Sequence, residues 1–261
     1  MMQSLQSDGI SFVSGNWPFD MDKVSLVFIH GAGLNKACWE NQVTGLSDLA
    51  NTIAVDLPGH GDSRLSGKEK IFDYARAVTD FLDLIHPPNP VLCGISMGGA
   101  IVQQMLINDK DRFQAAVLIN TGARLKVMPL IFETLSKSHS DFVDMTIGFG
   151  ISPKSDAKKL GPQIATCSQC HPQVVWKDFC ACDTFDVTRD LGAIKVPVLI
   201  LTAGDDIITP PKYGIFLEKN IKNARRQNIE DAGHFSPMEN PHAVNAAIRD
   251  FLLENRINRS G

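Results

Sequence analysis

One corner of the chain restricts the fold more than any other feature: a serine between two glycines, where an apolar run gives way to a helical pattern. The apolar run 91–93 ends at Gly94, and the helical pattern begins after Gly98. A Cβ two positions to either side of Ser96 would collide with the crossing backbone, so glycine suits both places. Such a strand-to-helix turn lifts the Ser96 hydroxyl out of the sheet. The free N–H groups of the helix that follows can stabilise a developing negative charge.

The composition is that of an ordinary folded protein. The chain has 261 residues, 44% of them hydrophobic and 21% charged, which suffices for one sizeable core or one domain with an insertion. The net charge is -4 and the basic residues are scattered, so we expect no nucleic-acid partner and no membrane partner. The first seven residues lack the pattern of a secretory signal, and no apolar run has the length of a membrane span. We therefore expect a cytoplasmic protein.

Short β-branched runs alternate with amphipathic stretches along most of the chain. This alternation predicts an α/β fold with a mostly parallel, doubly wound sheet and helices on both faces. Expected strands lie at residues 12–13 (an edge strand), 24–29, 52–55, 91–93 (the central strand before Ser96), 115–119, 196–201 and 226–229.

The alternation stops for roughly sixty residues after the strand at 115–119, which is too long for a plain loop in a compact domain. This stretch is apolar at helical spacing, and the pattern indicates a helical cap packed over the strand ends. We therefore expect a core domain of residues 1–120 and 190–261, and a cap insertion of residues 121–189.

Several motifs coincide in order along residues 24–253. They are His30-Gly31 after the first buried strand, the turn 56–61 after the next strand, the Ser96 corner, Asp206 ahead of Pro210, and Gly233-His234 ahead of the last helix. In these motifs the chain resembles the α/β-hydrolase family, whose serine, acid and histidine follow one another in the same order.

The resemblance implies a role for each of five residues. Ser96 would be the nucleophile, His234 the base and Asp206 the acid that orients the base. The backbone N–H groups of Ala32 and Met97 would form the oxyanion hole. A hydrolase of this kind needs no cofactor and no metal, and its partner would be a small-molecule acyl substrate.

The chemistry of a serine nucleophile leads to the same histidine independently. A serine hydroxyl needs a neutral imidazole within hydrogen-bond reach, which later returns the proton to the leaving group. Of the seven histidines, His234 alone is expected in a loop at the same sheet edge as Ser96. Two adjacent carboxylates compete for the role of acid. We choose Asp206 over Asp205 because family members usually carry the acid a few residues before a proline.

Other polar residues near the strand ends are expected to be structural. Asp56, His60 and Asp62 lie in a turn rich in glycine and proline, where carboxylates and imidazoles commonly cap backbone N–H groups. We expect His30 to brace the loop that follows it through a backbone hydrogen bond.

A serine at the corner also limits the reaction. Related dehalogenases and epoxide hydrolases use an aspartate there, so we expect hydrolysis of a small or medium carboxylic ester, lactone or thioester through an acyl-enzyme. The sequence resembles the esterase and enol-lactone hydrolase branch. One alternative is a carbon–carbon bond hydrolase of aromatic breakdown, although such enzymes usually carry tryptophan where this chain has Phe235. Another alternative is a small-molecule receptor that keeps the triad and turns over slowly.

The cap should build the substrate pocket from a few of its apolar residues. Candidates for contact with the substrate are Met128 and Phe132 of the cap, together with Trp39 and Phe235 of the core. For Trp39 we expect packing in the core before contact with the pocket.

A group of cysteines resembles a binding motif. Cys167, Cys170 and His171 match the C-x-x-C-H pattern of covalent haem attachment, and Cys180 and Cys182 follow closely. Haem attachment needs an exported chain and a haem pocket, and the sequence signals neither. We therefore expect neither haem nor zinc, and interpret the thiols as small apolar fillers.

Overall fold

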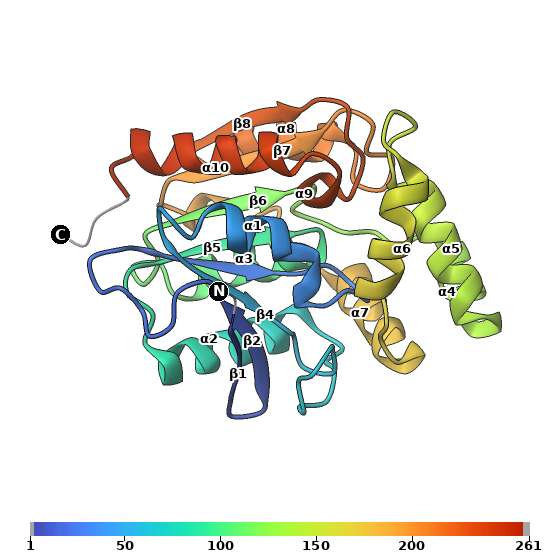
Figure 1. Cartoon of the computed structure of the whole chain (residues 1–261). Coiled ribbons are helices and arrows are strands. Elements are labelled where there is room, and N and C mark those ends of the chain that lie inside the picture. The colour runs from blue at the N-terminus through green and yellow to red at the C-terminus, as the bar shows by residue number, and fades with distance from the viewer. Residues whose placement is uncertain (1–2, 258–261) are drawn as a thin grey trace.

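The computed structural model describes residues 3–257 and contains one eight-stranded sheet in the order β1-β2-β4-β3-β5-β6-β7-β8 (Figure 1). The strands are β1 (Gln3–Ser7), β2 (Ile10–Ser14), β3 (Ser25–Ile29), β4 (Asn51–Val55), β5 (Pro90–Ile95), β6 (Ala115–Ile119), β7 (Val198–Ala203) and β8 (Ala224–Ile229). Strands β3 to β8 pair in parallel, whereas β1 and β2 pair antiparallel. The predicted α/β fold with a mostly parallel sheet is confirmed.

The sheet edge differs from the prediction. The strand expected at residues 12–13 is β2, which pairs with β4 on one side and with β1 on the other. The outermost strand is therefore β1, whose sequence QSLQS is mostly polar and gives little strand signal.

Helices cover both faces of the sheet. On one face lie α2 (Ile71–Ile85), α3 (Met97–Asn108) and α8 (Pro211–Asn220), and on the other α1 (Glu40–Gly45) and α10 (Pro241–Glu254). Successive side chains of β3 point to opposite faces of the sheet. Val27 packs on the face covered by α2, α3 and α8, whereas Leu26 and Phe28 pack on the face covered by α1 and α10. This alternation follows from the two-residue period of a strand. A short helix, α9 (Ser236–Glu239), precedes α10.

Four further helices come between β6 and β7. They are α4 (Pro129–Lys137), α5 (His139–Gly150), α6 (Ala157–Cys167) and α7 (Pro172–Thr184), and we call them the cap helices. Figure 1 shows them gathered at one end of the sheet, the end at which β5 passes into α3. They fall within the expected insertion. The division of the chain into two domains stays a prediction.

Among residues 3–257, no helix combines the length and the apolar character that a membrane span needs.

Candidate active site

Ser96 occupies the turn between β5 and α3 in a strained conformation, with φ 54° and ψ -119°. A Cβ on Gly94 would overlap the carbonyl of Gly98, and a Cβ on Gly98 would overlap the carbonyl of Ile29 in the neighbouring strand. The Ser96 N–H donates to the carbonyl of Ile119 at 3.0 Å, which fixes the turn against β6. The two glycines are therefore required by close backbone approach, as the sequence pattern indicates.

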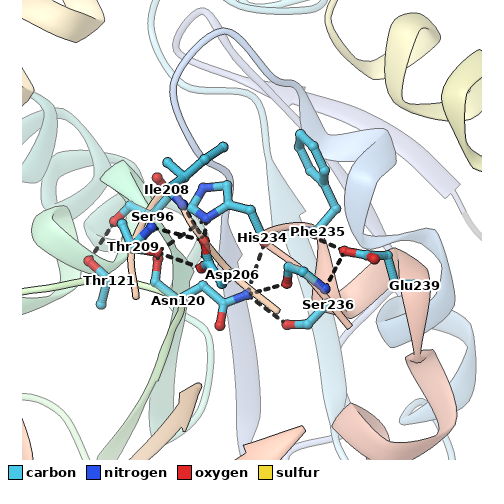
Figure 2. A network of polar contacts seen from close by, with 11 residues as sticks. Ser96, Asn120, Thr121, Asp206, Ile208, Thr209, His234, Phe235, Ser236 and Glu239 are labelled. Carbon is cyan, nitrogen blue, oxygen red and sulfur yellow. Dashed lines mark hydrogen bonds and ion pairs between the residues drawn. The ribbon is translucent and has the colours of Figure 1, made fainter. Parts of the chain in front are cut away.

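His234 and Asp206 are brought together by the loops that follow β8 and β7. His234 Nδ1 lies 3.0 Å from Asp206 Oδ2, and Asp206 Oδ1 accepts hydrogen bonds of 2.9 Å from the N–H groups of Ile208 and Thr209 (Figure 2). Burial alone would raise the pKa of the Asp206 carboxyl. The charge and hydrogen bond of His234, with the hydrogen bonds from Thr209, outweigh burial and hold this pKa below its ordinary value.

Asp205, the rejected candidate, faces a different partner. Its carboxylate accepts a hydrogen bond of 2.6 Å from the Ser152 hydroxyl, in the segment between α5 and α6, and lies 3.6 Å from Lys154 Nζ. The two adjacent carboxylates therefore have different partners: Asp206 contacts His234, and Asp205 contacts the cap.

The loop that carries His234 is fixed by two residues that the sequence analysis did not select. Asn120 Nδ2 lies 3.1 Å from the carbonyl of Gly233, 2.9 Å from that of His234 and 2.9 Å from the Ser236 hydroxyl. Glu239 Oε1 accepts from the N–H groups of Gly233 and Phe235, each at 3.0 Å (Figure 2). Asn120 directly follows β6, and its uncharged side chain holds the backbone of the loop that carries His234.

The glycine-rich loop 31–33 runs beside Ser96, and all three of its residues line the same cavity as Ser96 and His234. His30 braces this loop as expected: Nδ1 lies 2.8 Å from the carbonyl of Gly31, and Nε2 accepts from the N–H of Leu57 at 3.1 Å. One neutral tautomer satisfies both contacts. Burial, and after it the charge of His60, lowers the pKa of His30 to about 3, so the ring stays uncharged.

A buried carboxylate on α7 also holds the loop. Asp178 Oδ2 accepts hydrogen bonds of 2.8 Å from the Gly33 N–H and from His60 Nε2, and Oδ1 accepts one of 2.5 Å from the Tyr74 hydroxyl. The side chains of Asp178 and His60 are completely buried. The expected structural role of His60 is present, but the partner is a cap carboxylate rather than a backbone N–H group.

The surroundings of His60 favour its positively charged form. Its Nδ1 lies 3.1 Å from the carbonyl of Pro58 and its Nε2 faces Asp178, so both ring nitrogens meet acceptors. Burial alone would lower the pKa of His60. The charge and hydrogen bond of Asp178 overcome burial and raise this pKa well above its usual range. A buried ion pair therefore joins the cap to the core.

The sequence does contain a signal for Asp178. Val175, Asp178 and Cys182 follow one another at helical spacing and are all buried, so this carboxylate lies on the apolar face of α7. A charged residue on such a face needs a buried partner.

A cavity of about 380 Å³ lies between the core and the cap helices and contains Ser96 and His234 in its wall. Of the four residues predicted to contact substrate, Met128 and Phe235 line it. Trp39 is completely buried against Phe28, with ring centroids 5.1 Å apart, and Phe132 packs on Trp176 at 4.9 Å. Neither Trp39 nor Phe132 is part of the cavity wall.

The cap cysteines are distributed over separate clusters. Cys167 packs with the face of the sheet under α10, Cys182 with the opposite face, and Cys170 with a small cluster inside the cap. His171 Nδ1 instead accepts the Gln173 N–H at the start of α7. Within residues 3–257, no three His, Cys, Asp or Glu side chains gather as metal ligands would.

Comparison with known proteins identifies the family to which the chain belongs. A model of the alpha/beta hydrolase family matches residues 26–247, and the chain belongs to this family. It is accordingly a hydrolase, with esterases among its relatives.

Similar proteins include a pimeloyl-[acyl-carrier protein] methyl ester esterase of Neisseria meningitidis, 28% identical over 88% of this chain and 94% of the relative. A 3-oxoadipate enol-lactonase of Acinetobacter baylyi is 27% identical over 87% of this chain and 88% of the relative. Among solved structures, a thermophilic esterase superposes with a TM-score of 0.81 at 27% identity, covering 98% of both chains.

Proposed function

We propose that the protein hydrolyses a small or medium carboxylic ester or lactone with a hydrophobic acyl part, through an acyl-enzyme on Ser96. The observation that carries this proposal is the 3.0 Å contact of His234 Nδ1 with Asp206, in the wall of the cavity that also contains Ser96. Similarity to a methyl ester esterase and an enol-lactonase supports the substrate class, because esters and lactones share the same acyl–oxygen bond.

In the proposed first step the Ser96 hydroxyl attacks the carbonyl carbon while His234 Nε2 accepts its proton. The imidazolium that forms is stabilised by Asp206, whose lowered pKa keeps it ionised. His234 then gives the proton to the leaving alcohol, or to the ring oxygen of a lactone. A water molecule, deprotonated in turn by His234, releases the acid and restores Ser96.

We assign the negative oxygen of the tetrahedral intermediate to the N–H groups of Ala32 and Met97. Ala32 belongs to the loop held by His30 and Asp178, and Met97 is the first residue of α3. Two donors fixed before the reaction begins stabilise this charge without reorganisation. We also propose that residues 121–189 act as a cap domain, because the cap helices supply much of the cavity wall.

The proposal is tested with p-nitrophenyl esters of two to twelve acyl carbons and with simple lactones. We expect kcat in the ordinary enzyme range of roughly 1 to 1,000 per second on at least one of them. A receptor that keeps the triad would process all of them very slowly. Rates no higher than those in buffer across the whole series would contradict the proposal.

Ser96→Ala should abolish hydrolysis and leave the fold intact, because the smaller side chain fits the same turn. The expected loss in kcat is roughly a millionfold, as for nucleophile removal in other serine hydrolases. A fluorophosphonate should add its mass to the wild type and not to the variant. If the variant retained more than about a tenth of the wild-type kcat, Ser96 would not be the nucleophile.

A further inference from the structure

One face of α5 forms a long wall of the cavity. The α5 residues that line it are His139, Phe142, Val143, Met145, Thr146 and Phe149. Their spacing is that of a single helix face, and the last lies ten positions after the first. At 1.5 Å of rise per residue this wall is about 15 Å long.

The two ends of this wall are chemically different. At the C-terminal end, the Gly150 carbonyl accepts a hydrogen bond of 2.6 Å from the N–H of His234, so this end adjoins the reaction centre. His139 is the first residue of α5 and lies at the opposite end. A substrate acyl chain bound at Ser96 therefore has an apolar path along α5 that ends at an imidazole.

The length of the α5 wall indicates the size of that chain. An extended chain advances about 1.2 Å per bond, since a residue of three bonds spans ~3.3–3.6 Å, so about twelve bonds cover the wall.

His139 places an unsatisfied polar atom in this apolar setting. Its Nε2 is buried and has no hydrogen-bond partner, and its ring lies beside Phe142 with centroids 6.3 Å apart. Two other polar groups of the wall are engaged: the Ser168 hydroxyl donates to the Ile164 carbonyl at 2.8 Å, and Lys126 Nζ lies 2.8 Å from Asp183. A buried polar atom without a partner is costly, and a turn of the ring that brings Nε2 to the cavity would let a ligand group remove that cost.

We propose that the cavity binds a medium-length acyl chain whose far end carries a carboxylate or carbonyl oxygen, and that His139 Nε2 donates a hydrogen bond to this oxygen. The proposal rests on the ester hydrolysis proposed above and specifies its substrate class. An alkyl chain of the same length would fill the apolar path and leave Nε2 unpaired. His139 is thus a specificity-determining residue about 15 Å along α5 from the reaction centre.

The test compares p-nitrophenyl esters in matched pairs of four, eight, ten and twelve acyl carbons. One member of each pair ends in a methyl group, and the other in a carboxylate or a methyl ketone. We expect kcat/KM to favour the oxygen-ended member by about fivefold to tenfold near ten to twelve carbons, the effect of one hydrogen bond, and to show no such preference at four carbons. A third series ending in a hydroxyl tests the opposite assignment, in which Nε2 accepts; a preference confined to that series would overturn the donor role.

His139→Leu should bring the preference at ten to twelve carbons to about one, and His139→Phe should do the same if the leucine variant fails to fold. His242→Leu is the matched control, since His242 is exposed on α10 and lies outside the cavity wall; it should keep the wild-type preference. Hydrolysis of both members of each pair at equal rates by the wild type would overturn this inference and leave the proposed function standing. No hydrolysis of any ester would contradict the proposed function itself.

Discussion

Replacing Asp178 by asparagine removes one charge from the buried pair with His60 and hardly changes the shape of the side chain. The wild-type carboxylate accepts three hydrogen bonds, from Gly33, His60 and Tyr74, and is completely buried. Breaking a buried ion pair by removing one partner costs about 3–5 kcal/mol. For a chain of this size each kcal/mol lowers Tm by about 2–4 °C, so we expect a loss of roughly 6–20 °C.

The assay is thermal unfolding followed by circular dichroism, with kcat and KM measured on the best p-nitrophenyl ester. Asp183→Asn is the matched control on the same helix, because Asp183 pairs with an exposed lysine and such surface pairs contribute about 0–1 kcal/mol. We expect kcat to fall with Asp178→Asn, by up to about a hundredfold, because Gly33 belongs to the proposed oxyanion loop. A change in Tm no larger than that of the control would contradict the claim that the buried pair of Asp178 and His60 stabilises the fold.

The pH dependence provides a second measure of the same pair. The pKa of His60 is raised in the folded state, so its protonation stabilises the fold fully below the unfolded value of about 6.5. This contribution is lost as the pH rises through the folded pKa, which lies well above 6.5. The wild type should therefore lose stability between pH 6.5 and that higher value. In Asp178→Asn this slope should be reduced.

Two further outcomes concern the acid and the cysteines. Asp206→Asn should lower kcat by about 10⁴-fold by fixing the wrong tautomer of His234, whereas Asp205→Asn should act on Tm through its contact with Ser152 and change kcat little. Equal losses in kcat would leave the choice between the two carboxylates without support. Treatment with a chelator should change neither activity nor Tm. Near one zinc per chain in the purified protein, lost together with activity, would instead make the cap a metal-stabilised lid.

The corner at Ser96 was predictable because its requirements are local. A Cβ at Gly94 would overlap the Gly98 carbonyl within the same turn, so the spacing of the glycines around Ser96 already indicates the turn; at Gly98 the restriction comes from the Ile29 carbonyl of β3. The meeting of His234 with Asp206 was predictable from topology, since parallel strands bring their carboxyl ends to one edge of the sheet.

The cap was predictable as a set of helices, but not in its orientation. Phe132 and Ile131 are adjacent on α4, and only Ile131 lines the cavity, while Phe132 packs on Trp176. Both residues are apolar, so the sequence does not say which one faces the core. The pairing of Asp178 with His60 joins residues 118 apart and depends on how α7 docks, which no local pattern specifies.

The cap helices differ in how much of them is buried. Among the residues of α4 and α5, Leu135, Phe142 and Gly150 are buried, whereas α7 buries Val175, Ala181 and Cys182 together with the charged Asp178. Substitutions along the cavity face of α5 therefore disturb few core contacts, and most changes to partly exposed positions cost little stability. We therefore expect substitutions on α5 to change the proposed acyl preference at little cost in stability, while Asp178 of α7 continues to hold the loop at Gly33.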